Sequence, residues 1–431
     1  MGNLKLLFLC QTLPYPPDGG VWIRTYHVLR LLARAFDITA LCFERAATSG
    51  NGAASDIAAS RDALGRFAAV EVFPISQKHS RLRYAWDHLR SVALRRAYTA
   101  YMYDSSAYDT RLTDLVRSND FDLVHVDSLG DLAGYLPACR RIPVVCVHHN
   151  VESALLQRRA AIERSEWRSA YLRYQSRLTE ELERCWCERV ALNVAVSEQD
   201  RATLKRIAPA ARVAVVPNGV DIEEFQPDRT KGNGVAFVGG TNWFPNRDAL
   251  DFFCDEILPQ VRAARTGVPV RWIGSASTEQ RRYYFERYGV EVTGYVADVR
   301  PYMREAACHI VPLRAGGGTR LKILNSWAMG KAVVSTSVGC EGLAAEAGEN
   351  ILIRDDPTDF ANAILAVLDD DELRRRLGER GRATVEQLYS WEVIGHDLIE
   401  RYLRVAHGGA WGTRDGHPMG EAGSTPRPLI S

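Results

Sequence analysis

Short apolar segments rich in β-branched residues alternate with helical stretches along this whole chain, and no other feature limits the fold as strongly. Several segments are apolar at successive positions, which is typical of parallel strands covered by helices on both faces. The alternation therefore predicts a parallel α/β architecture. The predicted strands are 4–10, 38–43, 70–73, 123–126, 144–147, 192–196, 213–216, 235–238, 268–273, 290–293, 309–313, 332–335 and 351–353.

The length of the chain predicts more than one hydrophobic core. A chain of 431 residues exceeds one ordinary core and suits two domains. A polar segment rich in proline and glycine at 226–234 separates two similar halves. We therefore expect a first domain over 1–220 and a second over 221–390. The segment 407–431, rich in glycine, proline and polar residues, is predicted to be a disordered tail.

Charge and cysteine usage exclude several classes of protein. The 54 basic and 53 acidic residues nearly cancel, so nucleic acid is not an expected partner. No apolar run approaches the ~20 residues that span a bilayer. The nine cysteines lie mostly inside apolar segments without a Cys/His cluster, which predicts free thiols, no structural metal and a cytoplasmic location.

The segment 312–336 (PLRAGGGTRLKILNSWAMGKAVVST) carries the clearest chemical signal. A predicted strand runs into Gly316, Gly317 and Gly318, and after Thr319 a helix begins with Arg320 and Lys322 in its first turn. Glycine backbone N–H groups and a helix N-terminus attract anions. Two cations placed there repel each other unless an anion such as a diphosphate lies between them. The alternative is a tight turn with solvated basic residues.

This segment resembles the sugar-nucleotide site of retaining glycosyltransferases of the GT-B fold, family four. The resemblance is to the branch whose donor loop reads G-G-G-T-R-L-K, which includes exopolysaccharide and PEP-CTERM-associated sugar transferases. It extends over about residues 4–405. Further matching stretches are 14–20 (PYPPDGG), 148–152 (HHNVE), 196–200 (VSEQD), 216–221 (VPNGVD), 237–246 (FVGGTNWFPN) and 339–343 (GCEGL).

The resemblance implies a fold and a reaction. The fold would be α/β of the GT-B type, with two Rossmann-like domains whose parallel sheets face a central cleft and a C-terminal helix, 391–406, crossing back onto the first domain. The reaction would be metal-independent, cofactor-free transfer of a hexose, with retention, from a nucleoside-diphosphate sugar. The acceptor would be a glycan or a lipid-linked molecule in polysaccharide or glycoconjugate biosynthesis.

The same resemblance assigns site residues. Arg320 and Lys322 would stabilise the departing diphosphate, because the loop 239–245 lacks the Arg and Lys that other branches carry there. His149 would contact the donor sugar, and since side chains alternate, only one of His148 and His149 should face the cleft. The predicted donor-binding residues are Gly19, Gly20, Gly240, Thr241, Gly316, Gly317, Gly318, Thr319, Asn325 and Glu341.

Three groups of residues keep alternative interpretations open. Gly19 and Gly20 either approach the donor phosphate or form a plain strand-to-helix turn before a helix predicted at 21–36. Arg24 and His27 on that helix either reach the cleft or lie on the surface. Asn325 stands where the family has a glutamate that holds the ribose, which leaves a non-catalytic nucleotide-sugar-binding or assembly subunit as the second hypothesis. Glu341 is the nearest replacement carboxylate.

The segment 78–103 carries six Lys/Arg against one Asp, interleaved with Tyr and Trp. This composition suits an anionic membrane surface and would place a lipid-linked acceptor beside the first domain, at the inner face of the membrane. A solvated helix and loop is the alternative. Residues 155–190, in which Arg and Glu balance, are predicted to form one long solvated helix.

Overall fold

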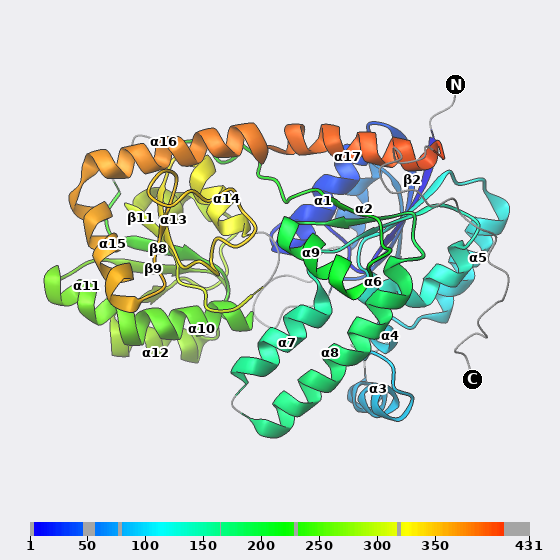
Figure 1. Cartoon of the computed structure of the whole chain (residues 1–431), viewed down its shortest axis with the longest axis horizontal. Helices are drawn as coiled ribbons and strands as arrows, with labels where there is room; N and C mark the ends of the chain where they lie inside the picture. The colour runs from blue at the N-terminus through cyan, green and yellow to red at the C-terminus, as the bar shows by residue number, and fades with distance from the viewer. Residues whose placement is uncertain are drawn as a thin grey trace.

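The computed structural model describes residues 4–45, 57–75, 80–163, 165–227, 232–316 and 320–408. It has two lobes, each built on one parallel sheet (Figure 1). The first sheet has the order β3-β2-β1-β4-β5-β6-β7, and the second has the order β10-β9-β8-β11-β12-β13. This is the expected GT-B architecture, and the predicted division at 220/221 falls between β7 and β8.

The strands are β1 Leu4–Cys10, β2 Phe36–Phe43, β3 Ala69–Phe73, β4 Leu123–Val126, β5 Val144–Val147, β6 Leu192–Ala195, β7 Val213–Val215, β8 Val235–Val238, β9 Val270–Ile273, β10 Glu291–Val292, β11 Cys308–Val311, β12 Ala332–Ser335 and β13 Leu352–Ile353.

The helices are α1 Gly20–Leu32, α2 Ile57–Gly65, α3 Arg81–Ala93, α4 Thr99–Met102, α5 Ser106–Ser118, α6 Leu129–Leu132, α7 Glu152–Ile162, α8 Glu166–Cys187, α9 Glu198–Ile207, α10 Phe244–Phe252, α11 Leu258–Ala264, α12 Thr278–Tyr288, α13 Arg300–Glu305, α14 Leu321–Ala328, α15 Pro357–Asp369, α16 Asp371–Leu388 and α17 Trp391–Ala406. No helix in the described ranges is long and apolar enough to cross a membrane.

Each of the predicted strands is present; β1, β4, β5, β8 and β12 have the predicted bounds, and the ends of the others are shifted. The helix predicted at 21–36 is wrong at its end, because Phe36 already pairs with Leu4 as the first residue of β2. Strand pairing therefore overrides the helical pattern at this point. The tail beyond residue 408 and the centre of the loop after β2 lie outside the described residues.

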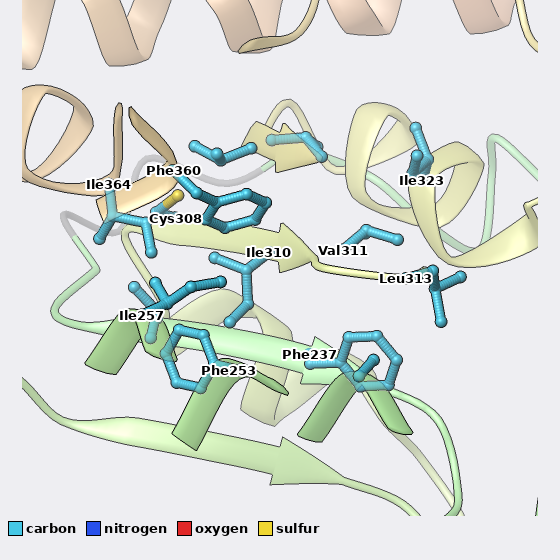
Figure 2. Packing of buried hydrophobic residues seen from close by; sticks show 14 of the residues in the cluster. Phe237, Phe253, Ile257, Cys308, Ile310, Val311, Leu313, Ile323, Phe360 and Ile364 are labelled. Carbon is cyan, nitrogen blue, oxygen red and sulfur yellow. The ribbon is translucent and has the colours of Figure 1, made fainter. Parts of the chain in front are cut away.

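Apolar side chains cover both faces of each sheet. In the second domain, Phe237 of β8 and Ile310 of β11 pack against Phe253 and Phe360 from the helices, all of them almost fully buried (Figure 2). The first sheet has one such cluster on each face. Both sheets are thus rigid supports for the loops at their strand ends.

The last helix joins the two domains. In Figure 1, α16 on the second domain and α17 on the first follow each other along the same side of the molecule. Trp391, Leu398 and Tyr402 of α17 are buried in the core of the first sheet. Gly395 allows this close approach, since a Cβ there would lie 2.5 Å from a Leu31 methyl of α1. The helix does cross back onto the first domain.

A second helical prediction is also wrong. Residues 155–190 form not one helix but two, α7 and α8, which lie side by side and project from the first domain (Figure 1). Small polar residues hold the pair together: Ser169 Oγ donates to the Ala160 carbonyl at 2.6 Å, and Ser176 Oγ donates to the Ser153 carbonyl at 2.8 Å. Pairing buries one side of each helix, which a single solvated helix would leave exposed.

Candidate functional site

The strand order of each sheet indicates where a ligand would bind. Parallel α/β sheets bind ligands at the carboxyl ends of the strands where the order reverses. In the second sheet these strands are β8 and β11, and in the first they are β1 and β4. The loops that follow them contain Gly239–Thr241, Gly316 and Asp127. The glycine segments singled out in the sequence therefore lie at the expected places.

Lys322 joins the β8 loop to the start of α14. Its Nζ donates to Asn246 Oδ1 at 2.8 Å and lies 4.3 Å from the centre of the Phe237 ring. Asn246 Nδ2 in turn donates to the Gly240 carbonyl at 3.0 Å. Burial, with a smaller contribution from the Arg320 cation, lowers the pKa of Lys322 to about 7. Lys322 is therefore only partly charged at neutral pH until an anion arrives.

Arg320 is buried at the beginning of α14. Its Nε and Nη2 donate to the Val338 carbonyl at 3.3 and 3.0 Å, and Nη2 lies 3.5 Å from Glu341 Oε2. Burial lowers the pKa of this guanidinium, and the Glu341 carboxylate opposes that effect. The fold thus keeps an arginine where its charge is unfavourable, which is a common property of functional sites.

Among the predicted donor-binding glycines near α14, Gly316 has a steric reason to be glycine. Gly316 adopts φ +138°, and a Cβ there would lie 2.8 Å from Arg320 Nη1. A Cβ on Gly20 would lie 3.8 Å from a Leu321 methyl, so the first domain meets the start of α14 there. Gly19 precedes α1 as its N-cap. Gly317, Gly318 and Thr319 lie outside the described residues.

Two predicted donor-binding residues, Thr241 and Asn325, differ in whether their side chains form hydrogen bonds within the protein. Thr241 is buried, and its Oγ1 donates to Gln280 Oε1 at 3.0 Å while its N–H donates to the Ser275 carbonyl. It therefore shapes the loop that carries Gly240. The Asn325 side chain on α14 makes no hydrogen bond to another described residue and is partly exposed. Its amide is available to a ligand.

In the first domain, His149 contacts an aspartate that sequence reasoning missed. His149 Nε2 lies 3.2 Å from Asp127 Oδ2, and Thr25 Oγ1 donates to the same oxygen at 2.7 Å. On its other side, His125 Nε2 lies 3.4 Å from Asp127 Oδ1 and its Nδ1 lies 2.7 Å from the Tyr402 hydroxyl of α17. Burial acts to raise the pKa of Asp127, but His149 and His125 outweigh it and hold the pKa well below its usual range.

The neighbouring histidine has a different environment. His148 Nε2 lies 2.9 Å from Asn193 Oδ1, and burial lowers the pKa of His148 to about 4. It is a neutral core residue. His149 therefore is the one of the two that meets the ionised carboxylate at the end of β4.

A small cavity of about 20 Å³, the size of roughly one water molecule, lies beside His149. Burial, with Asp131 and Glu183 nearby, raises the pKa of the Glu152 carboxyl in its wall to about 8. Glu152 does not cap α7; instead Glu183 accepts from the Ser153 N–H and hydroxyl. The lining residues are Ser128, Leu129, Gly130, Val147, His148, His149, Asn150, Glu152 and Glu183.

Neither Arg24 nor His27 reaches the domain interface or the surface. Arg24 is buried and donates to the carbonyls of Val216 and Pro217 and to Asn218 Oδ1 at 2.7 to 3.0 Å. His27 stacks on Trp391 with ring centres 4.5 Å apart, and burial lowers its pKa to about 3. Both residues fix the chain where it leaves the first domain.

Two family models match the chain. One, described as Glycosyltransferase Family 4, matches residues 18–224, and the other, described as Glycosyl transferases group 1, matches residues 232–370. The chain belongs to the GT-B glycosyltransferases. The two models meet where the structure divides into two sheets, so the sequence families and the lobes of this GT-B glycosyltransferase coincide.

Curated relatives share part of the chain. The phosphatidyl-myo-inositol mannosyltransferase of Mycobacterium tuberculosis is 27% identical over 239 residues, which is 52% of this chain and 62% of the relative. The match thus spans less than two thirds of that protein. The lipopolysaccharide core biosynthesis glycosyltransferase LpsE of Rhizobium meliloti is 36% identical over 123 residues, 27% of this chain and 33% of the relative.

Solved structures share the whole fold. HepE of Anabaena in complex with UDP-glucose superposes with a TM-score of 0.65 at 16% identity, covering 93% of this chain and 99% of HepE. Sucrose-phosphate synthase of Thermosynechococcus elongatus gives a TM-score of 0.67 at 17% identity, covering 94% and 100%. At such identities the likeness shows the GT-B fold.

Proposed function

We propose that this chain is a retaining glycosyltransferase that moves a hexose from a nucleoside-diphosphate sugar to a glycan or lipid-linked acceptor, without a metal ion. The observation that carries the proposal is the convergence of Arg320, Lys322 and the glycine loops at the carboxyl ends of β8 and β11. The UDP-glucose complex of HepE makes UDP-hexoses the first donors to test.

The proposed chemistry depends on the leaving group. Breaking the bond between the sugar and the diphosphate builds negative charge on the diphosphate, and preorganised cations stabilise that charge. Arg320 is already held in place by the Val338 carbonyl. The pKa of Lys322 is about 7, and a diphosphate bound beside it would favour its charged form.

In the proposed reaction the configuration is retained because the acceptor attacks from the face that the diphosphate leaves. The departing phosphate oxygen then takes the proton of the acceptor hydroxyl, so the protein mainly positions the two substrates. His149, oriented by Asp127, would hydrogen-bond the donor sugar. Glu152, neutral near pH 7, can both donate to and accept from an acceptor hydroxyl beside it.

The test of the proposal is transfer with a defined product. The purified protein, a UDP-hexose and a hydroxylated acceptor should give a glycoside whose anomeric configuration equals that of the donor, read from the proton NMR coupling of the anomeric hydrogen. Product of inverted configuration would refute retention. Turnover that requires an added divalent cation would refute metal independence.

A second candidate rests on Asn325, whose amide is uncharged and has no partner among the described residues. A glutamate normally supplies a stronger hydrogen bond to a ribose hydroxyl. If the chain is a non-catalytic binding subunit, N325E should create turnover that the natural chain lacks. If the chain is an enzyme, N325E should change the donor KM by less than about tenfold. Initial rates of both proteins distinguish the two.

The proposed lipid-linked acceptor is supported by α3. Leu82, Trp86 and Leu89 form a stripe on this helix and are 85%, 58% and 63% exposed. Its inner face is polar, with Asp87 buried and paired with Arg83 at 3.0 Å. Tyr171 of α8 binds His88 of α3, and Trp167, one turn away on α8, is 70% exposed. An outward apolar stripe with basic flanks suits an interface with anionic lipid.

We therefore expect the chain to bind vesicles containing anionic phospholipid. L82E/L89E should reduce the bound fraction in a flotation assay by about tenfold, because each change removes an exposed apolar side chain that would enter the lipid and adds charge repulsion. The matched control is F285E, which alters an exposed aromatic residue on α12 of the other domain. Equal binding by L82E/L89E and the natural chain would exclude α3 as the contact.

A further inference from the structure

Arg158 is a first-domain residue that reaches into the second domain. It lies on α7, and its Nη1 donates to the Gly316 carbonyl at 2.5 Å and to Glu341 Oε2 at 2.9 Å. Its Nη2 lies 3.4 Å from Glu341 Oε1. The guanidinium therefore meets the beginning of the glycine segment that the sequence assigns to a diphosphate. The side chain of Arg158 is 38% exposed.

Two arginines from different domains converge on one carboxylate. Glu341 Oε2 lies 2.9 Å from Arg158 Nη1 and 3.5 Å from Arg320 Nη2. The Arg158 cation contributes to lowering the pKa of Arg320, so the two guanidinium groups repel each other. An anion between them removes this repulsion, and a diphosphate carries more charge than one carboxylate.

The second domain supplies few cations to the donor site. The β8 loop, Gly239–Phe244, contains no Arg or Lys. Burial lowers the pKa of Lys322 to about 7, and its Nζ is held by Asn246. A diphosphate that met only Arg320 and Lys322, even with Lys322 fully charged, would meet no cation from the first domain. Arg158 is placed to supply the missing cation.

We propose that Arg158 is a further donor-binding residue: the first domain supplies its guanidinium to the diphosphate, and Glu341 holds it when no diphosphate is bound. This inference rests on the proposed function. It makes the diphosphate a bridge between the two domains, because Arg320 binds from one side and Arg158 from the other. It also frees the Glu341 carboxylate for a hydroxyl of the donor.

A comparable ion pair away from the donor site provides the control. Partly exposed Arg–carboxylate pairs contribute little to stability. Arg34 and Glu392 form such a pair, with two contacts of 2.8 and 2.6 Å between α1 and α17. R34Q is therefore a matched control, since it removes the same type of bidentate pair from a site away from α14.

The experiment is calorimetric titration of the full chain with UDP, GDP, ADP and dTDP, and with inorganic pyrophosphate as a probe that carries no base. For the diphosphate that binds the natural chain most tightly, R158Q should weaken affinity by about 10- to 100-fold, as expected for a lost charge-assisted bidentate contact. R158K, which keeps the charge but not the fork, should give an intermediate loss. R34Q should bind like the natural chain.

The outcomes separate this inference from the function on which it rests. If R320Q loses affinity while R158Q and R158K bind like the natural chain, Arg158 only pairs with Glu341 and the inference is overturned. If no diphosphate binds the natural chain, the proposed function fails and the inference fails with it. A loss in R158Q accompanied by an unchanged melting temperature of the empty protein supports the inference.

Discussion

Replacement of Arg320 by alanine should lower kcat by about 10²- to 10³-fold, the loss typical of removing one preorganised group that stabilises transition-state charge. The fold should tolerate the change, because burial already disfavours the Arg320 charge, as its lowered pKa indicates. Sites that keep a buried cation for function commonly gain stability when it is removed. Initial rates and thermal unfolding of R320A measure both expectations.

The matched control is Arg314, which lies in the loop after β11. Its guanidinium pairs with Asp248 of α10 at 2.7 Å and is 46% exposed. R314A removes an arginine from the same loop without touching Val338 or Glu341, so its turnover should stay within about twofold of the natural rate. Full turnover by R320A would exclude Arg320 from the reaction.

Replacement of Asp127 by alanine should affect both stability and catalysis. The carboxylate is fully buried and contacts His149, His125 and Thr25. Removing it leaves buried donors unsatisfied, at a cost of roughly 3 kcal/mol in the free energy of unfolding. A displaced His149 should reduce kcat by on the order of 10²-fold. Urea unfolding and initial rates test the two effects.

If Asp127 only positions His149, its replacement should change kcat but not the donor Kd. D127N should therefore lower kcat. The donor Kd should stay close to the natural value, because the diphosphate-binding residues Arg320 and Lys322 are in the other domain. T25V serves as control, since it removes one hydrogen bond to Asp127 at a cost of about 1 kcal/mol. Natural kcat in D127N would mean that Asp127 serves the fold alone.

The sequence predicted the fold well because its signals are local. Strands such as Val144–Val147 are apolar at every position and bounded by polar turns, and such segments have few alternatives in a parallel sheet. The ends were less predictable, since the beginning of β2 at Phe36 depends on pairing with Leu4. The split of 155–190 into α7 and α8 likewise depends on contacts between distant residues, such as Ser169 with Ala160.

The candidate site was predictable only in part. Asp127 follows a predicted strand directly, so the rule that ligands meet strand ends could have found it. Arg158 and Asn246 carry no such signal. Arg158 lies next to Arg159 on α7, and only the position of the second domain shows which of the two meets Glu341. Asn246 matters because it accepts a hydrogen bond from Lys322, which lies 76 residues later in the chain.

The central claim is that the loops after β8 and β11 form a diphosphate site, and thermal unfolding with nucleotides tests it most directly. UDP, GDP, ADP, dTDP and their hexose conjugates are added singly, without metal ions. A ligand at a hundred times its Kd should stabilise the chain by about 2.7 kcal/mol and raise Tm by several degrees. The account predicts such a shift for one base, greatly reduced in R320A. Unchanged Tm with every nucleotide would contradict it.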